Sequence, residues 1–357
     1  MNQIADQTTP KQDYSSTSLF KKRLKKFKSV KRGWYSFWII LTAYFLSFFC
    51  PMLMNNKALV VSYNGDWYFP VFKYYPSTTF GQTEYGEAVY RDLAKKFDAS
   101  GDGNWLIMPP YPFGPYESLT DSRSHPPNPP SWQHWFGTDD RGRDVFVRLF
   151  YGLRISLTFA IIATTVAYVI GISIGAMLGY FSGKVDLFGQ RLIEIWASIP
   201  FLYTIMILSS IIRPNFYMLV FFISVFGWMG MTYFVRGEFY REKAKDYVHA
   251  AVSMGATDRK IVFKHILPNA LTPVIAFGPF HIVGDISALV SLDYLGFGLP
   301  PPTPSWGELV GQGVANIFSW WLVLFPFGAL FITLILVVFI GEAIREAFDP
   351  RVYSRLR

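Results

Sequence analysis

Long apolar runs dominate the chain and alternate with charged, proline-rich and glycine-rich stretches. A helix needs about 20 mostly apolar residues to cross roughly 30 Å of hydrocarbon. Several runs have about this length, and we expect each to form a membrane-spanning helix. The pattern therefore predicts an all-α, polytopic membrane protein with about six transmembrane helices. The runs are Trp34–Leu53, Ile155–Phe181, Ile193–Ile212, Phe216–Val235, Pro273–Leu295 and Ile317–Ile340.

The fifth run is the least apolar, because it contains His281, Asp285 and Asp293. Charged side chains are costly in hydrocarbon, so this helix should face the protein interior or a water-filled cavity. Asp285 and Asp293 are eight residues apart and therefore share a helix face. Both are candidates for a substrate path, where they could meet an amino group or a basic side chain of a peptide. The alternative is a structural hydrogen bond to a neighbouring subunit.

Composition and charge agree with a membrane protein. Hydrophobic residues make up 51% of the chain and charged residues 16%, against roughly 25% charged residues in soluble domains. Lys and Arg favour the cytoplasmic side, and their distribution predicts that both termini are cytoplasmic. The net charge of +8 thus reflects membrane topology. Nucleic-acid binding would need a basic soluble domain, and the sequence contains none. The inner segments hold 22 Lys and Arg, with 9 in residues 1–33, 2 in 182–192, 7 in 236–272 and 4 in 341–357. The outer segments hold 11, with 10 in residues 54–154 and 1 in 213–215.

The N-terminal segment is polar over residues 1–18, which we expect to be disordered. Phe20, Leu24 and Phe27 then recur at helical spacing among basic residues. This spacing favours a basic amphipathic helix on the anionic inner leaflet. A positively charged anchor without an ordered helix is the alternative. The first apolar run is too long for a signal peptide and lacks a clear small-x-small cleavage site, so we expect a retained anchor.

Residues 55–150 form a long outer segment that is rich in aromatic residues and prolines. Its aromatic content is sufficient for a small ordered lid, and its prolines favour extended or turn structure near its end. Asp98–Asn104 resembles the start of a calcium loop, but Pro109 stands where such a loop needs a bidentate acid. A Gly/Asp turn is therefore the preferred interpretation of this stretch.

Acidic and basic residues alternate where the outer segment meets the second apolar run. Asp139, Asp140 and Asp144 are interleaved with Arg141 and Arg143. We expect ion pairs among them to hold the top of the second helix, and we expect no catalytic role.

The chain carries no evident motif for chemistry of its own. It lacks the Gly-x4-Gly-Lys-Ser/Thr phosphate loop, because the nearest stretch, Gly179–Val185, has the wrong spacing and no Ser or Thr for magnesium. It also lacks His-Glu-x-x-His and Gly-x-Ser-x-Gly. Its five histidines are scattered, and Cys50 is its one cysteine. We therefore expect no catalytic residue, no metal site and no cofactor in this chain.

A polar, basic stretch before the fifth run has the pattern of two short helices. Tyr247–Met254 reads as a helix with two alanines on one side, and Gly255 should end it. Asp258 can cap a second helix, Arg259–Ile266, and Pro268 should begin the turn into the fifth run. Such a pair makes a rigid peg that fits closely into another protein. An ordinary amphipathic connecting loop is the alternative.

The string Ala250-Ala251-x3-Gly255-x9-His265-Ile266-Leu267-Pro268 resembles the EAA loop of ABC-importer permeases of the oligopeptide/dipeptide/nickel family. Leu295–Gly307 is similar to the turn that follows the fifth helix in that family, and the likeness is closer to its C-type subunit than to the B-type. Phe136–Leu157 is similar to the stretch that leads into the second helix, with matching positions Gly137, Thr138, Asp139, Gly142, Arg143 and Asp144.

The sequence also departs from that family. His249 stands where the acid that names the EAA loop is expected, and the acid usual near Leu289 is replaced by Asp285 and Asp293 on either side. The outer segment after the first helix is much longer than usual. This enlarged segment resembles the permease of the peptide (microcin C type) uptake system.

The resemblance implies the fold and role of a type I ABC-importer permease in a bacterial inner membrane. Such a subunit moves peptides or peptide-like compounds from the periplasm to the cytoplasm by alternating access. Its implied partners are a second permease, a periplasmic peptide-binding protein, and two ATPase subunits or one fused ATPase, which bind ATP and Mg. The residues implied to couple to the ATPase are Ala250, Ala251, Gly255, Asp258, His265, Leu267 and Pro268.

On this basis the chain divides into five parts. They are a cytoplasmic basic segment (1–33), the first transmembrane helix (34–54), a periplasmic loop or small domain (55–150), the permease transmembrane domain (151–346) with its coupling loop (244–268), and a cytoplasmic tail (347–357). The competing hypothesis is an ion-coupled secondary transporter that works without an ATPase. It would use Asp285, His281 and Glu194 as a relay.

Overall fold

The computed structural model describes residues 19–83, 85–119 and 125–348 of the chain. The disorder expected for residues 1–18 and most of the tail predicted at 347–357 lie outside the described residues.

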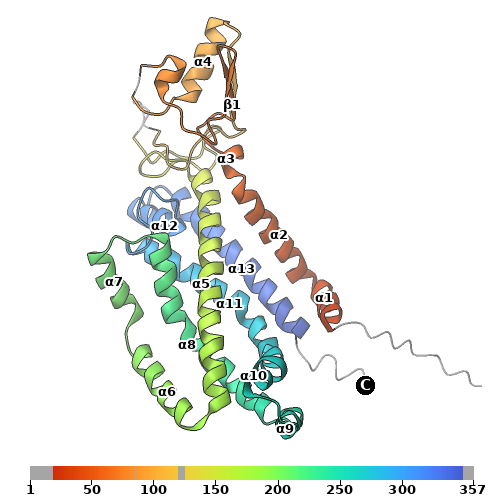
Figure 1. Cartoon of the computed structure of the whole chain (residues 1–357). Coiled ribbons are helices and arrows are strands. Elements are labelled where there is room, and N and C mark those ends of the chain that lie inside the picture. The colour runs from red at the N-terminus through yellow and green to blue at the C-terminus, as the bar shows by residue number, and fades with distance from the viewer. Residues whose placement is uncertain (1–18, 84, 120–124, 349–357) are drawn as a thin grey trace, which may run out of the picture.

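Long helices run side by side and carry a small domain with a sheet at one end (Figure 1). The chain begins with α1 (Leu19–Ser29), α2 (Lys31–Phe48) and α3 (Cys50–Leu53). The small domain contains β1 (Val60–Tyr63), β2 (Asp66–Tyr68), η1 (Ser77–Phe80), α4 (Tyr90–Ser100) and β3 (Trp105–Ile107). The remaining elements are α5 (Val145–Phe181), α6 (Gly183–Ala197), α7 (Phe201–Ile211), α8 (Phe216–Lys243), α9 (Asp246–Ser253), α10 (Asp258–Lys260), η2 (Ile261–Ile266), α11 (Leu267–Tyr294), α12 (Trp306–Ala315) and α13 (Trp321–Phe348).

Within the described residues, four helices are long and apolar enough to cross a membrane. They are α5, α8, the continuous helix Asp258–Tyr294, and α13. A fifth crossing is possible through α6 and α7, which meet at an angle of 63°. The all-α polytopic class is thus confirmed, but the predicted helix Ile193–Ile212 is not continuous, because it is divided between α6 and α7. Pro200 stands at the break and has no N–H to continue the helix.

The other predicted helices also differ in their bounds from those observed, and the differences at α5 and α2 have a clear cause. α5 begins ten residues before the predicted start at Ile155. The prediction began too late because the first turns of α5 contain Arg148 and Arg154 and are therefore not apolar. α2 has 18 residues and begins with Lys31 and Arg32, so it falls short of the apolar helices above. It nevertheless lies along α13, where Gly33 fits so closely that an added Cβ would be 2.1 Å from the Ala343 Cβ.

Small residues bring α5 and α8 together along much of their length. Gly171, Gly175 and Gly179 recur every fourth residue and face α8. A Cβ added at these positions would lie 2.8, 2.7 and 2.5 Å from the nearest α8 atoms. Thr232 also donates a hydrogen bond of 3.3 Å to the carbonyl of Gly171. This spacing of small residues is a common way to pack helices within a membrane.

The sheet domain, which we define as residues 54–119, is ordered around its own apolar core. Its strands pair antiparallel in the order β2-β1-β3, so β1 lies in the centre. One face of the sheet packs with α4, where Val61, Phe80, Leu93 and Phe97 are buried together. The strands were not predicted from sequence. The stretch Asp98–Asn104, which resembles the start of a calcium loop, covers the end of α4. It contains Gly101, whose left-handed conformation (φ 63°) terminates that helix.

Candidate functional site

The two short helices predicted before the fifth run are present as α9 and α10. They lie at the end of the helical bundle opposite the sheet domain (Figure 1). Gly255 lies in the turn between them with φ 75°, a left-handed conformation that glycine adopts without strain. A Cβ added to Gly255 would meet nothing within 4 Å, so backbone conformation and not packing calls for glycine here.

Two predicted details of this segment are wrong. Asp258 does not cap the second helix, because Thr257 holds the N-cap position and no side chain there makes a capping hydrogen bond. Pro268 does not begin a turn, because it occupies the first turn of α11 and the helix is continuous from Asp258 to Tyr294.

The join between α10 and α11 is a π-helical stretch, η2, over Ile261–Ile266. π-helical turns are rare and occur often at functional sites. His265 lies within this stretch, and Leu267 is the first residue of α11. Both are therefore part of a helix and not of an irregular connector. The backbone of α10 is therefore helically continuous with that of α11.

A first clasp, centred on Tyr247, fixes α9 to its neighbours. The Tyr247 hydroxyl lies 2.6 Å from Glu242 Oε2 at the end of α8 and donates to it. Asn269 Nδ2 donates to the same hydroxyl over 3.2 Å from α11. Burial, followed by the hydrogen bond to Glu242, raises the pKa of Tyr247 above its usual value. Glu242 is buried and also pairs with Lys245 at 2.6 Å.

A second clasp, centred on Tyr180, fixes α10. The Tyr180 hydroxyl at the end of α5 donates a hydrogen bond of 2.6 Å to Asp258 Oδ1. Lys243 Nζ, at the end of α8, donates to the Tyr180 carbonyl over 2.5 Å. Asp258 thus anchors the helical pair to α5, which is a different role from the cap expected for it.

The outward surface of the helical pair is more apolar than its sequence context suggested. Ala251 is buried against the rest of the chain, whereas Ala250 is exposed, so the two alanines do not act alike. Val252 and Met254, at the end of α9, are 55 and 80% exposed, and Phe263, on η2 after α10, is 62% exposed. Sequence reasoning missed these three, although apolar residues at exposed positions of a charged segment were the available signal.

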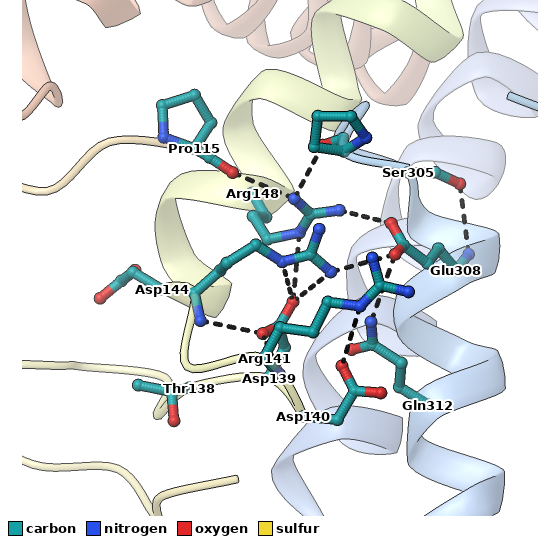
Figure 2. A network of polar contacts seen from close by, with 12 residues as sticks. Pro115, Thr138, Asp139, Asp140, Arg141, Asp144, Arg148, Ser305, Glu308 and Gln312 are labelled. Carbon is teal, nitrogen blue, oxygen red and sulfur yellow. Dashed lines mark hydrogen bonds and ion pairs between the residues drawn. The ribbon is translucent and has the colours of Figure 1, made fainter. Parts of the chain in front are cut away.

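A buried ionic network lies at the opposite end of the bundle, where α5 begins (Figure 2). Asp139 is fully buried, and its Oδ1 accepts hydrogen bonds of 2.9 Å from the backbone N–H groups of Arg141 and Arg143. Its Oδ2 accepts from Arg143 Nε over 2.7 Å and lies 3.6 Å from Arg148 Nε. The prediction of ion pairs at the top of this helix is thus confirmed.

Glu308 on α12 completes this network. It lies 3.0 Å from Arg143 and 2.5 Å from Arg148, so the two buried guanidinium groups face the buried carboxylate of Asp139 and the carboxylate of Glu308, whose side chain is 14% exposed. Arg148 also donates to the carbonyls of Pro115 and Pro302. Burial lowers the pKa of Arg143, but Asp139 and Glu308 outweigh burial and hold the pKa above its usual value. Arg148 and Glu308 were not predicted, because 160 residues separate them.

The other residues of the predicted motif shape the same turn. Gly137 and Gly142 adopt φ 75° and 74°, and neither could carry a Cβ without meeting a backbone carbonyl within 2.7 Å. Asp144 caps α5 by accepting from the Val147 N–H over 3.0 Å. The carbonyl of Thr138 accepts from Trp321 Nε1 on α13 over 3.1 Å. The turn therefore ties together α5, α12 and α13.

Asp285 and Asp293, the two candidates for the substrate path, have different surroundings in the structure. Both oxygens of Asp293 are used within the chain, because Oδ1 accepts from the Leu299 N–H (2.6 Å) and Oδ2 from the Ser305 hydroxyl (2.5 Å). Ser305 in turn caps α12 at Glu308. Asp293 thus stabilises the turn after α11 through hydrogen bonds within this chain.

Asp285 lies near other polar groups in the middle of the bundle. It accepts a hydrogen bond of 2.6 Å from Thr164 on α5, and it is partly exposed. His281 packs edge to face on Tyr168, whose buried hydroxyl finds no hydrogen-bond partner in the described part of the chain. Glu194, the third member of the relay expected for an ion-coupled transporter, is exposed and pairs with Arg191 at 2.6 Å. The relay is therefore not assembled.

These features describe a membrane-embedded subunit with a protruding helical pair on one side and a rigid turn on the other. The sequence model of the binding-protein-dependent transport system inner membrane component matches residues 171–354. The chain belongs to this family of ABC-importer permeases, which places it in an inner membrane as a multi-pass protein.

Individual relatives support the same family. The chain is 43% identical to the inner membrane ABC transporter permease protein YejE of Escherichia coli (strain K12), over 92% of this chain and 96% of that protein. It is 38% identical to the peptidoglycan transport system permease protein YejE of Agrobacterium fabrum, over 96% and 95%. It is 35% identical to the dipeptide transport system permease protein DppC of Bacillus subtilis, over 66% and 75%. The predicted resemblance to peptide permeases is thereby confirmed.

Proposed function

We propose that this permease moves peptides or peptide-like compounds, peptidoglycan-derived peptides among them, from the periplasm to the cytoplasm. The names of the relatives support this substrate class, because peptidoglycan and dipeptide transport are attributed to proteins that match most of the chain. Both YejE relatives match over 92% or more of the chain, a span that must include most of the sheet domain.

The observation that carries the proposal is the helical pair α9–α10 with its exposed apolar side chains. Exposed apolar groups on an otherwise polar segment are typical of a protein interface. The basic residues favour a cytoplasmic location for this end of the bundle, together with both termini. We therefore assign the pair to the ATPase partner, which binds the ATP and Mg that this chain has no motif to hold. Two ATPase subunits or one fused ATPase would serve both permeases.

The proposed mechanism is alternating access. Closure of the ATPase dimer on ATP would move α9 and α10, and the continuous helix from Asp258 would carry that motion into α11. The clasps at Tyr247 and Tyr180 would pass it to α8 and α5 at the same time. The cavity between this permease and a second, similar one would then open to the periplasm and accept a peptide from the binding protein. Asp285 is the remaining candidate for contact with a basic group of that peptide.

The test is reconstitution of the permease pair with its ATPase and binding protein in vesicles. ATP-dependent uptake of a labelled peptide is the expected result. Replacing Gly255 with Leu should abolish uptake and release the ATPase, because a branched side chain is strained at φ 75°. Gly237→Leu is the matched control, since Gly237 lies exposed within α8 and an added Cβ meets nothing within 4 Å. Uptake that persists without any ATPase would contradict the proposal.

A further inference from the structure

Helix α1 carries an unusual concentration of positive charge. Six of its eleven residues are Lys or Arg, and none is acidic. It meets α2 at Val30, where the helix is interrupted with ψ 83°. Figure 1 shows α1 at the end of the bundle that also carries α9 and α10. Its two faces have different surroundings.

The inward face of α1 is fixed to the rest of the chain. Lys26 pairs with Glu346 on α13 at 2.7 Å. The Arg23 guanidinium lies 4.5 Å from the centre of the Phe348 ring and also donates to Thr272 on α11 over 3.4 Å. This face therefore braces the end of α13 and the beginning of α11 against each other.

The outward face holds Lys21, Leu24, Lys25 and Lys28, which helical spacing places together. All four are exposed, and Leu24 is 39% exposed. In the described ranges, no acidic residue pairs with any of these three lysines, although Lys28 lies 5.2 Å from the centre of the Trp34 ring. Three cations and a single apolar residue thus form a positively charged, exposed surface.

An aromatic cluster at the start of α2 marks the level of this surface. Phe27, Trp34, Phe37 and Trp38 pack on one another with centroid distances of 5.6–6.3 Å. Trp38 and the neighbouring Tyr35 are 48 and 61% exposed. Trp and Tyr gather where hydrocarbon meets headgroups. Because Lys28 Nζ lies over the Trp34 ring, the C-terminal end of α1 lies at this level.

We infer that the outward face of α1 binds the headgroups of anionic phospholipids, and that this binding holds the brace to α13 and α11 in place. Lipid is the occupant that fits, because the lysines lie beside an aromatic belt and an anionic membrane surface attracts such a basic segment. The inference rests on the proposed membrane orientation only in assigning the lipids to the cytoplasmic leaflet.

The experiment uses the purified importer complex in detergent, to which phosphatidylglycerol or zwitterionic phosphatidylethanolamine is added. A ligand that binds the folded state raises the melting temperature. We expect phosphatidylglycerol to raise it more than phosphatidylethanolamine does. The triple variant Lys21→Gln, Lys25→Gln and Lys28→Gln should need on the order of 100-fold more phosphatidylglycerol for the same rise. The matched triple Lys→Arg variant, which keeps the charge, should behave like the native complex.

An unchanged phosphatidylglycerol response in the glutamine variant overturns the inference. So does a glutamine variant that loses the ATPase but keeps the lipid response, because the face would then bind protein. A Lys→Arg variant that also loses the response contradicts recognition by charge. Since melting temperature does not depend on transport, these outcomes are separable from a failure of the proposed function.

Discussion

Tyr180 donates a hydrogen bond of 2.6 Å to Asp258, and this one contact joins the end of α5 to the first residue of α10. Replacing Tyr180 with Phe removes it without removing the ring. We expect assembly to persist and transport per ATP to fall several-fold, because a hydrogen bond to a charged group is worth about 1.5–3 kcal/mol. The measurement is uptake divided by ATP hydrolysis in vesicles. Tyr203→Phe is the control, since Tyr203 on α7 is 66% exposed and makes no hydrogen bond within the described chain. An equal effect in both variants would refute the role of the clasp.

The buried network at the start of α5 predicts a large loss of stability when one charge is removed. Arg148→Met leaves Glu308 with one guanidinium partner in place of two. Breaking a buried pair in this way costs about 3–5 kcal/mol, which thermal unfolding of the purified permease should reveal. Arg141→Met serves as the control, because its side chain is 52% exposed and 4.0 Å from Asp140. We expect less than about 1 kcal/mol for the control. A similar loss in both would show that the network does not stabilise this end.

The close approach of α5 and α8 gives a prediction about glycine. Gly175→Ala places a Cβ 2.7 Å from the Thr232 carbonyl and should destabilise the helix pair by about 1–3 kcal/mol. Gly230→Ala on α8 has nothing within 4 Å and should be neutral or slightly stabilising, because alanine favours helix. Melting temperatures of the two variants in one detergent provide the comparison. Equal temperatures would mean that the glycines do not set the helix spacing.

Replacing the two carboxylates of α11, Asp285 and Asp293, should have different effects, one on transport and the other on stability. Asp293→Asn disturbs the hydrogen bonds to Leu299 and Ser305, so we expect lower stability by about 1–3 kcal/mol. Asp285→Asn should leave stability nearly unchanged and reduce uptake of peptides with basic groups. Expression and melting temperature report the first effect, and uptake by reconstituted complex reports the second. Normal uptake by a stable Asp285→Asn complex would remove Asp285 from the path.

Hydropathy predicted the helical class and the main spans, because apolar length is a local property of the sequence. It placed the start of α5 too late, since Arg148 looks unsuited to a buried helix until Glu308, 160 residues away, is seen beside it. The sheet was missed for a related reason. Its strands are only three or four residues long, and β1 pairs with β3 across more than 40 residues.

The coupling segment was predictable as two short helices with a glycine turn, because helix-ending glycine is a local signal. Its anchoring was not predictable. Tyr180 and Glu242 belong to other helices, and only the folded chain brings them to Asp258 and Tyr247. The same holds for Asp293, whose partner Ser305 follows a turn whose shape the sequence does not specify.

The central claim is that the outside of α9–α10 contacts the ATPase. A photo-crosslinking amino acid at Met254, which is 80% exposed, tests it in the assembled importer. The control position is Phe318, which is 95% exposed and lies between α12 and α13, near the other end of the bundle. We predict an ATPase adduct from Met254 and none from Phe318. No ATPase adduct from Met254, or equal adducts from both positions, would contradict the account.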